Sequence, residues 1–128
     1  MAQHNELGKK GEEDAVGFLK ANGYEILAQN YRYGKGEIDI ICKKNKLTIF
    51  CEVKTRSSDY FGTPEESVTS KKIRLIKRTA EKYLFQNKIE TEVRFDIVSI
   101  VSNQNILKIY HLKDAFFQDA DDADSIYQ

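Results

Sequence analysis

"GEIDIICKKNKLTIFCEVKTR", residues 36–56, contains two runs of β-branched and apolar residues on either side of a polar segment, and this pattern predicts a β-hairpin. Three charged residues interrupt the runs: Asp39 in the first, and Glu52 and Lys54 in the second. A charge buried in a sheet costs several kcal/mol unless it is paired or binds a metal. These three residues therefore need a structural or a functional explanation.

The register of the hairpin decides whether the three charges meet, because side chains alternate between the two faces of a strand. A two-residue turn at positions 44–45 pairs Asp39 with Phe50. An alternative register pairs Asp39 with Glu52. Both registers bring Asp39, Glu52 and Lys54 to one face as near cross-strand neighbours, whereas a three-residue loop would separate them.

Two carboxylates and an ammonium on one sheet face suit the metal-assisted hydrolysis of a phosphodiester. Mg²⁺ prefers oxygen ligands and often binds through one or two carboxylates while it keeps several waters. The ion can polarise a phosphoryl oxygen and activate a water, and a nearby lysine can stabilise the charge that develops on the phosphate. The alternative is a structural ion pair in which Lys54 bridges Asp39 and Glu52, and the spacing leaves both interpretations open.

Hydrophobic periodicity along the rest of the chain predicts a single α/β domain over residues 1–117, followed by an acidic tail, 118–128, that we expect to be disordered. Asn5 is the expected N-cap of the first helix, and Gly23 is its expected C-terminal stop. The expected helices cover 5–22, 69–87 and, as a short terminal piece, 114–117; the expected strands cover 24–32, 37–43, 47–54, 93–101 and 106–112.

The first helix carries an acid near its apolar stripe. Glu12 lies three and seven residues before Ala15 and Leu19, which places its carboxylate beside the face that packs on the sheet. Gly8 and Gly11 each cost this helix about 1 kcal/mol relative to alanine. Their presence indicates that another group approaches the helix closely at this turn.

The net charge of the chain does not predict a class of binding partner, because its 20 basic and 20 acidic residues cancel. The middle of the chain, however, is basic. Between residues 43 and 94 there are thirteen Lys or Arg and seven Asp or Glu. Tyr60 and Phe61 could stack on an unpaired base or pack against the sheet. Basic side chains that could contact a phosphate backbone, or simply form a solvated face, are Arg56, Lys71, Lys72, Arg74, Lys77 and Arg78.

Other residues bear on location and stability. No stretch approaches the roughly 20 apolar residues of a membrane span, and the N-terminal residues lack the apolar core of a signal peptide. Cys42 and Cys51 have no metal-ligand spacing and are predicted to be buried free thiols of a reduced, cytoplasmic protein. Arg94 and Asp96 share one strand face and are predicted to form a structural ion pair near the candidate site.

The spacing of Asp39, Glu52 and Lys54 resembles the PD-(D/E)xK nuclease motif, with Ile38 in place of the usual proline before the first acid. The resemblance extends from Gly8 to Val101. It implies a restriction-endonuclease-like αβββαβ core, with a mixed central sheet flanked by helices. In chain order, the segments GKKGEEDAVGFL, GYEIL, NYR, GEIDII, CEVKTR, FGTPEESV, KKIRLI, YL and RFDIV resemble the bacterial YraN-like family, which is related to archaeal Holliday-junction resolvases.

This resemblance implies roles for five residues. Asp39 and Glu52 would be metal ligands together with the backbone carbonyl of Val53, Lys54 would be the catalytic lysine, and Glu12 would be the acid from the first helix. The implied cofactor is Mg²⁺ or Mn²⁺, and the implied function is that of an endonuclease hydrolysing phosphodiester bonds in DNA, including branched or structured DNA. We expect contacts with the DNA backbone and no membrane partner. The sequence is compatible with a monomer or a homodimer. The alternative is a non-catalytic nucleic-acid-binding module with a vestigial nuclease site.

Overall fold

Two helices and five strands form the part of the chain that the computed structural model describes, residues 2–57, 68–104 and 106–116. The acidic tail from residue 118 onward, and Tyr60 and Phe61, lie outside these residues. Neither described helix is long and apolar enough to cross a membrane. The elements are α1 (Ala2–Ala21), β1 (Glu25–Tyr33), β2 (Gly36–Lys44), β3 (Leu47–Arg56), α2 (Ser70–Gln86), β4 (Glu92–Asn103) and β5 (Ile106–Leu112).

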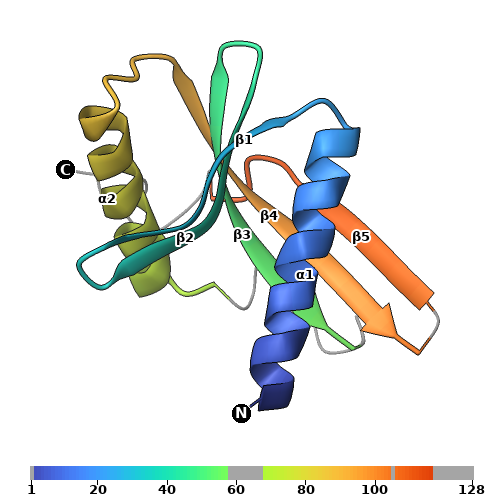
Figure 1. The fold of residues 1–128 in the computed structure, drawn as a ribbon. Coiled ribbons are helices and arrows are strands. Elements are labelled where there is room, and N and C mark those ends of the chain that lie inside the picture. Colours follow the sequence, from blue (N-terminus) through green and yellow to red (C-terminus); the bar gives the residue numbers. More distant parts are fainter. Residues whose placement is uncertain (1, 58–67, 105, 117–128) are drawn as a thin grey trace.

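The strands form one mixed sheet in the order β1-β2-β3-β4-β5, in which only the β3–β4 pair is parallel. Parallel neighbours need a crossover, and α2 lies in the segment that connects β3 to β4. Helix α1 packs on one face of the sheet, mainly over β3, and α2 packs on the other face, over β2 and β1 (Figure 1). The predicted α/β fold with an αβββαβ core is confirmed, and β5 extends it at one edge.

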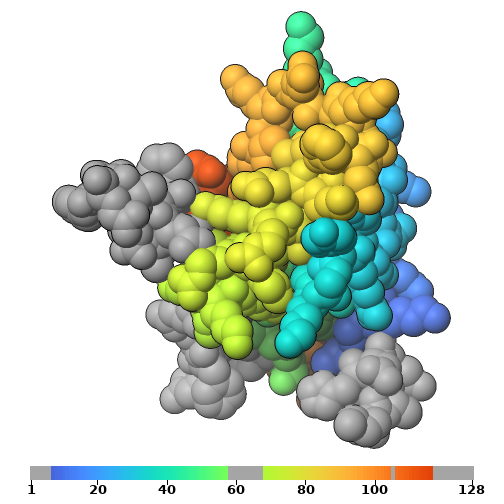
Figure 2. Space-filling model, turned by 90° about the vertical axis from the view of Figure 1, so that its left-hand side faces the viewer, coloured from blue at the N-terminus to red at the C-terminus, as the bar shows by residue number. Residues whose placement is uncertain are grey.

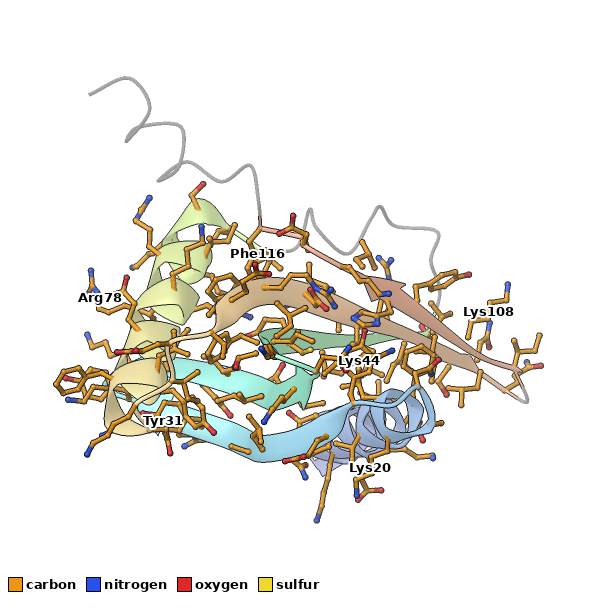
Figure 3. The ribbon with its side chains drawn as sticks, turned by 90° about the horizontal axis from the view of Figure 1, so that it is seen from above. Lys20, Tyr31, Lys44, Arg78, Lys108 and Phe116 are labelled. Atoms are coloured by element: carbon orange, nitrogen blue, oxygen red, sulfur yellow. The ribbon has the colours of Figure 1, made fainter. Side chains whose placement is uncertain are left out.

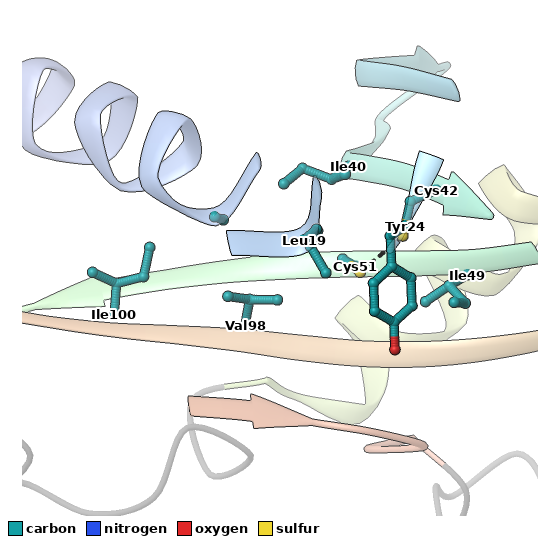
Figure 4. Packing of buried hydrophobic residues seen from close by; sticks show 9 residues of the cluster. Leu19, Tyr24, Ile40, Cys42, Ile49, Cys51, Val98 and Ile100 are labelled. Atoms are coloured by element: carbon teal, nitrogen blue, oxygen red, sulfur yellow. Dashed lines mark hydrogen bonds between the residues drawn. The ribbon is translucent and has the colours of Figure 1, made fainter. Parts of the chain in front are cut away.

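Alternating residues of the strands fill two hydrophobic clusters, one on each face. Leu19 of α1 packs on the first face with Ile40, Cys51 and Val98 of the central strands (Figure 4). Both cysteines are buried and free, as predicted, and the Sγ atoms of Cys42 and Cys51 lie 4.0 Å apart.

The second cluster lies beneath α2. Ile76 and Tyr83 of α2 contact a layer that includes Ile41 and Phe50 from the central strands. The Phe50 ring meets the Tyr83 ring edge-on, with 6.1 Å between centroids. This packing fixes α2 against the β2 side of the sheet, next to the strands that carry the acids.

The helix ends follow local sequence signals. Gly23 adopts φ 88°, and the amides of Gly23 and Tyr24 donate to the carbonyls of Lys20 and Leu19, which together form a Schellman motif. Thr69 caps α2, because its side chain accepts a hydrogen bond from the Lys72 amide. The expected N-cap at Asn5 is wrong, since α1 already begins at Ala2.

The short terminal helix expected from residue 114 is also wrong, because residues 113–116 form turns. Backbone amides that a helix would use internally are directed to β4 instead. The Asp114 amide donates to Asp96 Oδ1 (2.9 Å), and the Ala115 amide donates to the Phe95 carbonyl (2.8 Å). These bonds stabilise the chain after β5 against the sheet.

The predicted ion pair of Arg94 and Asp96 is confirmed and belongs to a larger network. The Asp96 carboxylate is fully buried, and it accepts two 2.8 Å hydrogen bonds from Arg94 and one of 2.7 Å from His111 Nε2. Burial by itself raises the pKa of Asp96, but the hydrogen bonds from His111, Arg94 and the Asp114 amide outweigh it and lower the pKa below its ordinary value. The network therefore holds a buried charge that joins β4 to β5.

Candidate active site

The candidate site forms where β2 and β3 separate. The two strands pair from Lys44 and Leu47 to Ile40 and Cys51, and no further pairs follow although both strands continue. The connecting turn is residues 45–46, so the turn predicted at positions 44–45 is wrong by one residue. Asn45 adopts φ 56°, a left-handed conformation that asparagine tolerates better than most residues.

This register aligns Asp39 with Glu52, one step beyond the last pair. Asp39 turns its carboxylate into the gap, and its Oδ2 accepts a hydrogen bond of 2.8 Å from the Val53 amide. The amide would otherwise lose its strand partner at this point. Asp39 thus replaces one rung of the ladder with a side-chain contact, and this fixes its position beside Glu52.

Glu52 is a buried carboxylate with one oxygen unsatisfied. Its side chain is 5% exposed, Oε2 lies 4.0 Å from Lys72 Nζ, and Oε1 has no hydrogen-bond partner among the described residues. Burial, and next the charge of Asp39, raise the pKa of Glu52 to about 9, while Lys72 and Lys54 lower it by less. An orphaned buried carboxylate oxygen beside a second acid is the donor arrangement that a divalent cation satisfies.

Two ammonium groups accompany the acids. Lys54 is half-buried on β3, and burial, followed by contact with Lys72, lowers the pKa of its ammonium. Lys72 reaches the same place from the first turn of α2. From the sequence, Lys72 could contact a phosphate backbone or lie on a solvated face, and the structure places it beside the acid pair.

Glu12 belongs to α1, which packs on the face of the sheet opposite to α2. Its pKa is raised by burial and by the nearby charge of Asp39. The side-chain amide of Asn30, with its nitrogen turned toward the acids, donates to Glu12 Oε1 (3.2 Å) and Glu37 Oε1 (3.1 Å). Asn30 therefore orients Glu12, a contribution that the sequence interpretation missed.

Two hollows flank the acid pair and share Asp39, Glu52 and Lys72. One, of 380 Å³, lies toward α1, and the other, of 230 Å³, lies between α2 and the β1–β2 turn. The four residues predicted to be catalytic, Glu12, Asp39, Glu52 and Lys54, all line the larger of the two, together with Leu7, Gly8, Val53, Thr55 and Lys72.

Gly11 confirms the predicted close approach to the first helix, because a Cβ there would overlap Thr55 Oγ1. Only a glycine lets α1 lie this near to the end of β3. Gly8 differs, since a Cβ there would meet no described atom within 4 Å. It lines the 380 Å³ hollow, so no described residue makes the predicted close approach at Gly8.

The residues present fit a divalent metal. Asp39 and Glu52 supply two carboxylates beside the Val53 backbone, and Glu52 Oε1 lacks another partner within the described segments. Those segments contain no convergent group of three or more His, Cys, Asp or Glu side chains. Mg²⁺ does not require such a group, because it binds through one or two carboxylates and retains water.

The basic residues predicted to contact nucleic acid occupy different environments. Lys71, Arg74 and Arg78 are exposed on α2, and Arg78 points away from the sheet in Figure 3. Lys77 lies over the Phe95 ring, 5.7 Å from its centroid. Arg56 is half-buried at the end of β3.

A larger hollow, of 710 Å³, lies beside the β2–β3 turn and the start of β4. It contains Arg94, whose guanidinium is already bonded to Asp96, and the lysines of the turn. None of the four predicted catalytic residues lines it. Its chemistry is that of a mixed-charge surface, so the smaller hollows around Asp39 are the better candidate.

The raised pKa of Glu52 predicts how the stability of the metal-free protein depends on pH. Because folding raises this pKa, the folded state holds the proton more strongly, and the free energy of unfolding falls as pH rises from about 4.3 toward 9. The slope from this residue is at most about 1.4 kcal/mol per pH unit. Urea unfolding at pH 6 to 9 in EDTA should show this decline in the wild type and a flatter profile in Glu52→Gln. Parallel profiles would contradict the assignment.

Comparison with known proteins shows which protein family this chain resembles. The model of a family described as "Uncharacterised protein family UPF0102" matches residues 11–100. A UPF0102 protein of Christiangramia forsetii is 50% identical over 117 residues, which cover 91% of this chain and 98% of that relative. A UPF0102 protein of Flavobacterium psychrophilum is 44% identical with the same coverage, and one of Persephonella marina is 46% identical over 85% of this chain and 91% of the relative.

Proposed function

This chain belongs to the uncharacterised protein family UPF0102, and we propose that it is a metal-dependent nuclease that hydrolyses phosphodiester bonds in DNA. The observation that carries the proposal is the pair Asp39 and Glu52, in which a buried carboxylate oxygen has no partner among the described residues. Lys54 and Lys72 lie beside this pair. Acids, ammonium groups and an adjoining hollow are the parts that phosphodiester hydrolysis requires.

Asp39, Glu52 and the Val53 carbonyl are the groups that would hold Mg²⁺ or Mn²⁺. A bound ion would polarise a phosphoryl oxygen and make a coordinated water more acidic. The Val53 amide fixes Asp39 through the 2.8 Å hydrogen bond. The burial that raises the pKa of Glu52 also means that metal binding must displace a proton from this carboxyl.

The two lysines divide the remaining tasks. Lys54, with its lowered pKa, sits next to the acids, where it can orient the attacking water and exchange a proton with it. Lys72 has 43% of its side chain accessible, so its ammonium can move from Glu52 to a phosphate oxygen of the substrate. Glu12 would accept a hydrogen bond from a water at the edge of the same hollow.

The function is tested with labelled linear, nicked, flapped and four-way DNA, each with EDTA, Mg²⁺ or Mn²⁺. We expect cleavage of at least one structure with metal and none in EDTA, and no cleavage by Asp39→Asn. Binding of DNA without cleavage under every metal condition would overturn the nuclease proposal and favour the alternative, a nucleic-acid-binding module.

Binding should depend steeply on salt, since the exposed cations of α2 would neutralise phosphates. Each phosphate contact adds roughly 0.9 to the slope of log K against log salt for duplex DNA. Replacing Lys71 and Arg78 with alanine should therefore reduce the slope by up to about 1.8. The matched control is Lys20→Ala with Lys108→Ala, which removes two charges away from α2 (Figure 3). If the salt slope changed equally in both double variants, the result would contradict a specific contact between α2 and DNA.

We also propose a reducing, cytoplasmic location. The Sγ atoms of Cys42 and Cys51 are 4.0 Å apart, so a small shift of the two strands would allow an oxidant to join them. Free thiols at this separation are stable where the surroundings keep them reduced. The test is to unfold the protein directly from cells in an alkylating reagent, reduce it, and titrate the thiols that appear. Thiols released only by reduction would reveal a disulfide and contradict the proposed location.

A further inference from the structure

Two exposed aromatic rings flank one lysine at the far end of α2. Phe85 is 80% exposed and Tyr33 is 46% exposed. Lys82 Nζ lies 5.1 Å from the centroid of the Tyr33 ring and 5.9 Å from that of Phe85. One exposed aromatic residue is ordinary, but two rings that share a cation form a defined surface, which we call the aromatic patch.

The aromatic patch is connected to the candidate site by the contact between α2 and the β1–β2 hairpin. Gly36 packs so closely on α2 that a Cβ there would overlap Thr79 Oγ1. Further along, Tyr31 Oη donates a 2.6 Å hydrogen bond to Gln86 Oε1. In Figure 2 the cyan part of the chain, around the β1–β2 turn, lies against α2, in yellow.

The 230 Å³ hollow opens between these same two elements, with Lys35 and Leu75 in its lining beside the acids. Lys72 and Phe85 lie on one continuous helix. The helix rises 1.5 Å per residue, so they are separated by about 20 Å along its axis. The exposed side of that helix carries Lys71 and Arg78, which gives it a charge complementary to a phosphate backbone.

We propose that the aromatic patch binds an unpaired nucleotide of the DNA whose backbone lies in the candidate site. The base would stack on the face of Tyr33 or Phe85, and Lys82, whose ammonium lies over both rings, would turn from them to the phosphate of that nucleotide. Nucleotides stacked as in a duplex strand are about 3.4 Å apart, so this nucleotide lies at most about six positions from the scissile bond. The inference rests on the proposed function, and it defines the substrate class as DNA with a single-stranded branch, flap or end.

Charge complementarity favours this occupant over a protein. A second copy of the chain would have to cover a lysine and the neighbouring cations of α2 with its own surface. Base stacking leaves the ammonium of Lys82 next to a phosphate. Association of copies through this patch is therefore an outcome that the test must detect.

The test measures DNA binding in EDTA, where cleavage plays no part. Fluorescence anisotropy compares a single-stranded 20-mer, a flapped duplex and a fully paired duplex, for the wild type, Phe85→Ala and Tyr33→Ala. We expect each variant to bind the first two DNAs about 5- to 100-fold more weakly and the paired duplex nearly as well as the wild type. Phe85→Trp should retain binding, because tryptophan also stacks.

Leu107→Ala is the matched control, since it removes a side chain of β5 that is 51% exposed. It should bind all three DNAs like the wild type. Equal weakening on paired and unpaired DNA, or no weakening in Phe85→Ala, would overturn the inference. A concentration-dependent dimer that Phe85→Ala abolishes would overturn it in favour of self-association.

The two proposals fail separately. Patch-dependent binding by a wild type that never cleaves would refute the nuclease and leave the aromatic patch supported. Metal-dependent cleavage with unchanged DNA binding in both aromatic variants would refute the aromatic patch alone.

Discussion

Asp39→Asn is expected to lower the rate of DNA cleavage by about 1000-fold or more and to abolish the stabilisation of the protein by metal. The variant keeps an acceptor oxygen for the Val53 amide, so the local backbone should be preserved. It loses one of the two carboxyl ligands, and with it the charge beside Glu52 that helps to raise the pKa of that buried carboxyl. In EDTA the variant should therefore unfold at the same temperature as the wild type or higher.

Melting curves of each protein in EDTA and in saturating Mg²⁺ or Mn²⁺ provide the measurement. The wild type should gain stability from metal, by about 2.7 kcal/mol at a concentration of 100 times Kd, and Asp39→Asn should gain none. Lys54→Ala should lose cleavage and keep the metal-dependent gain. This split separates a ligand of the metal from a residue that acts on the substrate.

Glu25→Gln is the matched control, because Glu25 is an exposed acid of β1 that lines neither hollow beside the acid pair. It should retain both cleavage and the response to metal. A structural ion pair predicts another result: Asp39→Asn would lose stability in EDTA and in metal alike, and neither ion would stabilise the wild type. That outcome would contradict the metal site.

The second large effect concerns stability. Asp96→Asn is expected to lower the free energy of unfolding by about 3–5 kcal/mol, because Arg94 would remain as a largely buried cation without its counter-ion. The asparagine NH₂ group would also face donors from His111 and the Asp114 amide. Urea unfolding at pH 7 gives the measurement.

A surface pair provides the comparison for Asp96. Arg32 and Glu37 are 3.7 Å apart with side chains 75% and 38% exposed, and Arg32→Ala should cost less than about 1 kcal/mol. A similar loss in both variants would contradict a special role for the buried network.

The pH dependence of Asp96 has the opposite sign to that of Glu52. Folding lowers the pKa of Asp96, so its contribution is complete above the unfolded value of about 3.9 and is lost as pH falls through the folded value. Asp96→Asn should therefore show less loss of stability between pH 5 and 3 than the wild type. If the variant lost as much stability as the wild type between pH 5 and 3, the result would contradict this assignment.

Much of this molecule follows from local sequence. Alternating apolar residues define the strands, and Gly23 and Thr69 end and begin helices through their own backbone or side-chain bonds. The meeting of Asp39 and Glu52 on adjacent strands also follows, because the period of a strand and a short turn restrict the register to a few choices. Glu12 was inferred from its helical stripe and from family resemblance.

Tertiary packing decided the rest, because it joins residues that no local period relates. Lys72 reaches Glu52 only because α2 packs on the sheet, and Lys82 of the same helix reaches the Tyr33 ring through the same packing. The strand pairing of β2 with β3 ends before Asp39, which lets Asp39 bond the Val53 amide, and the alternation of residues along the strands does not predict where that pairing ends. The pKa of Glu52 depends on burial and neighbouring charge, quantities that exist only once the chain has folded.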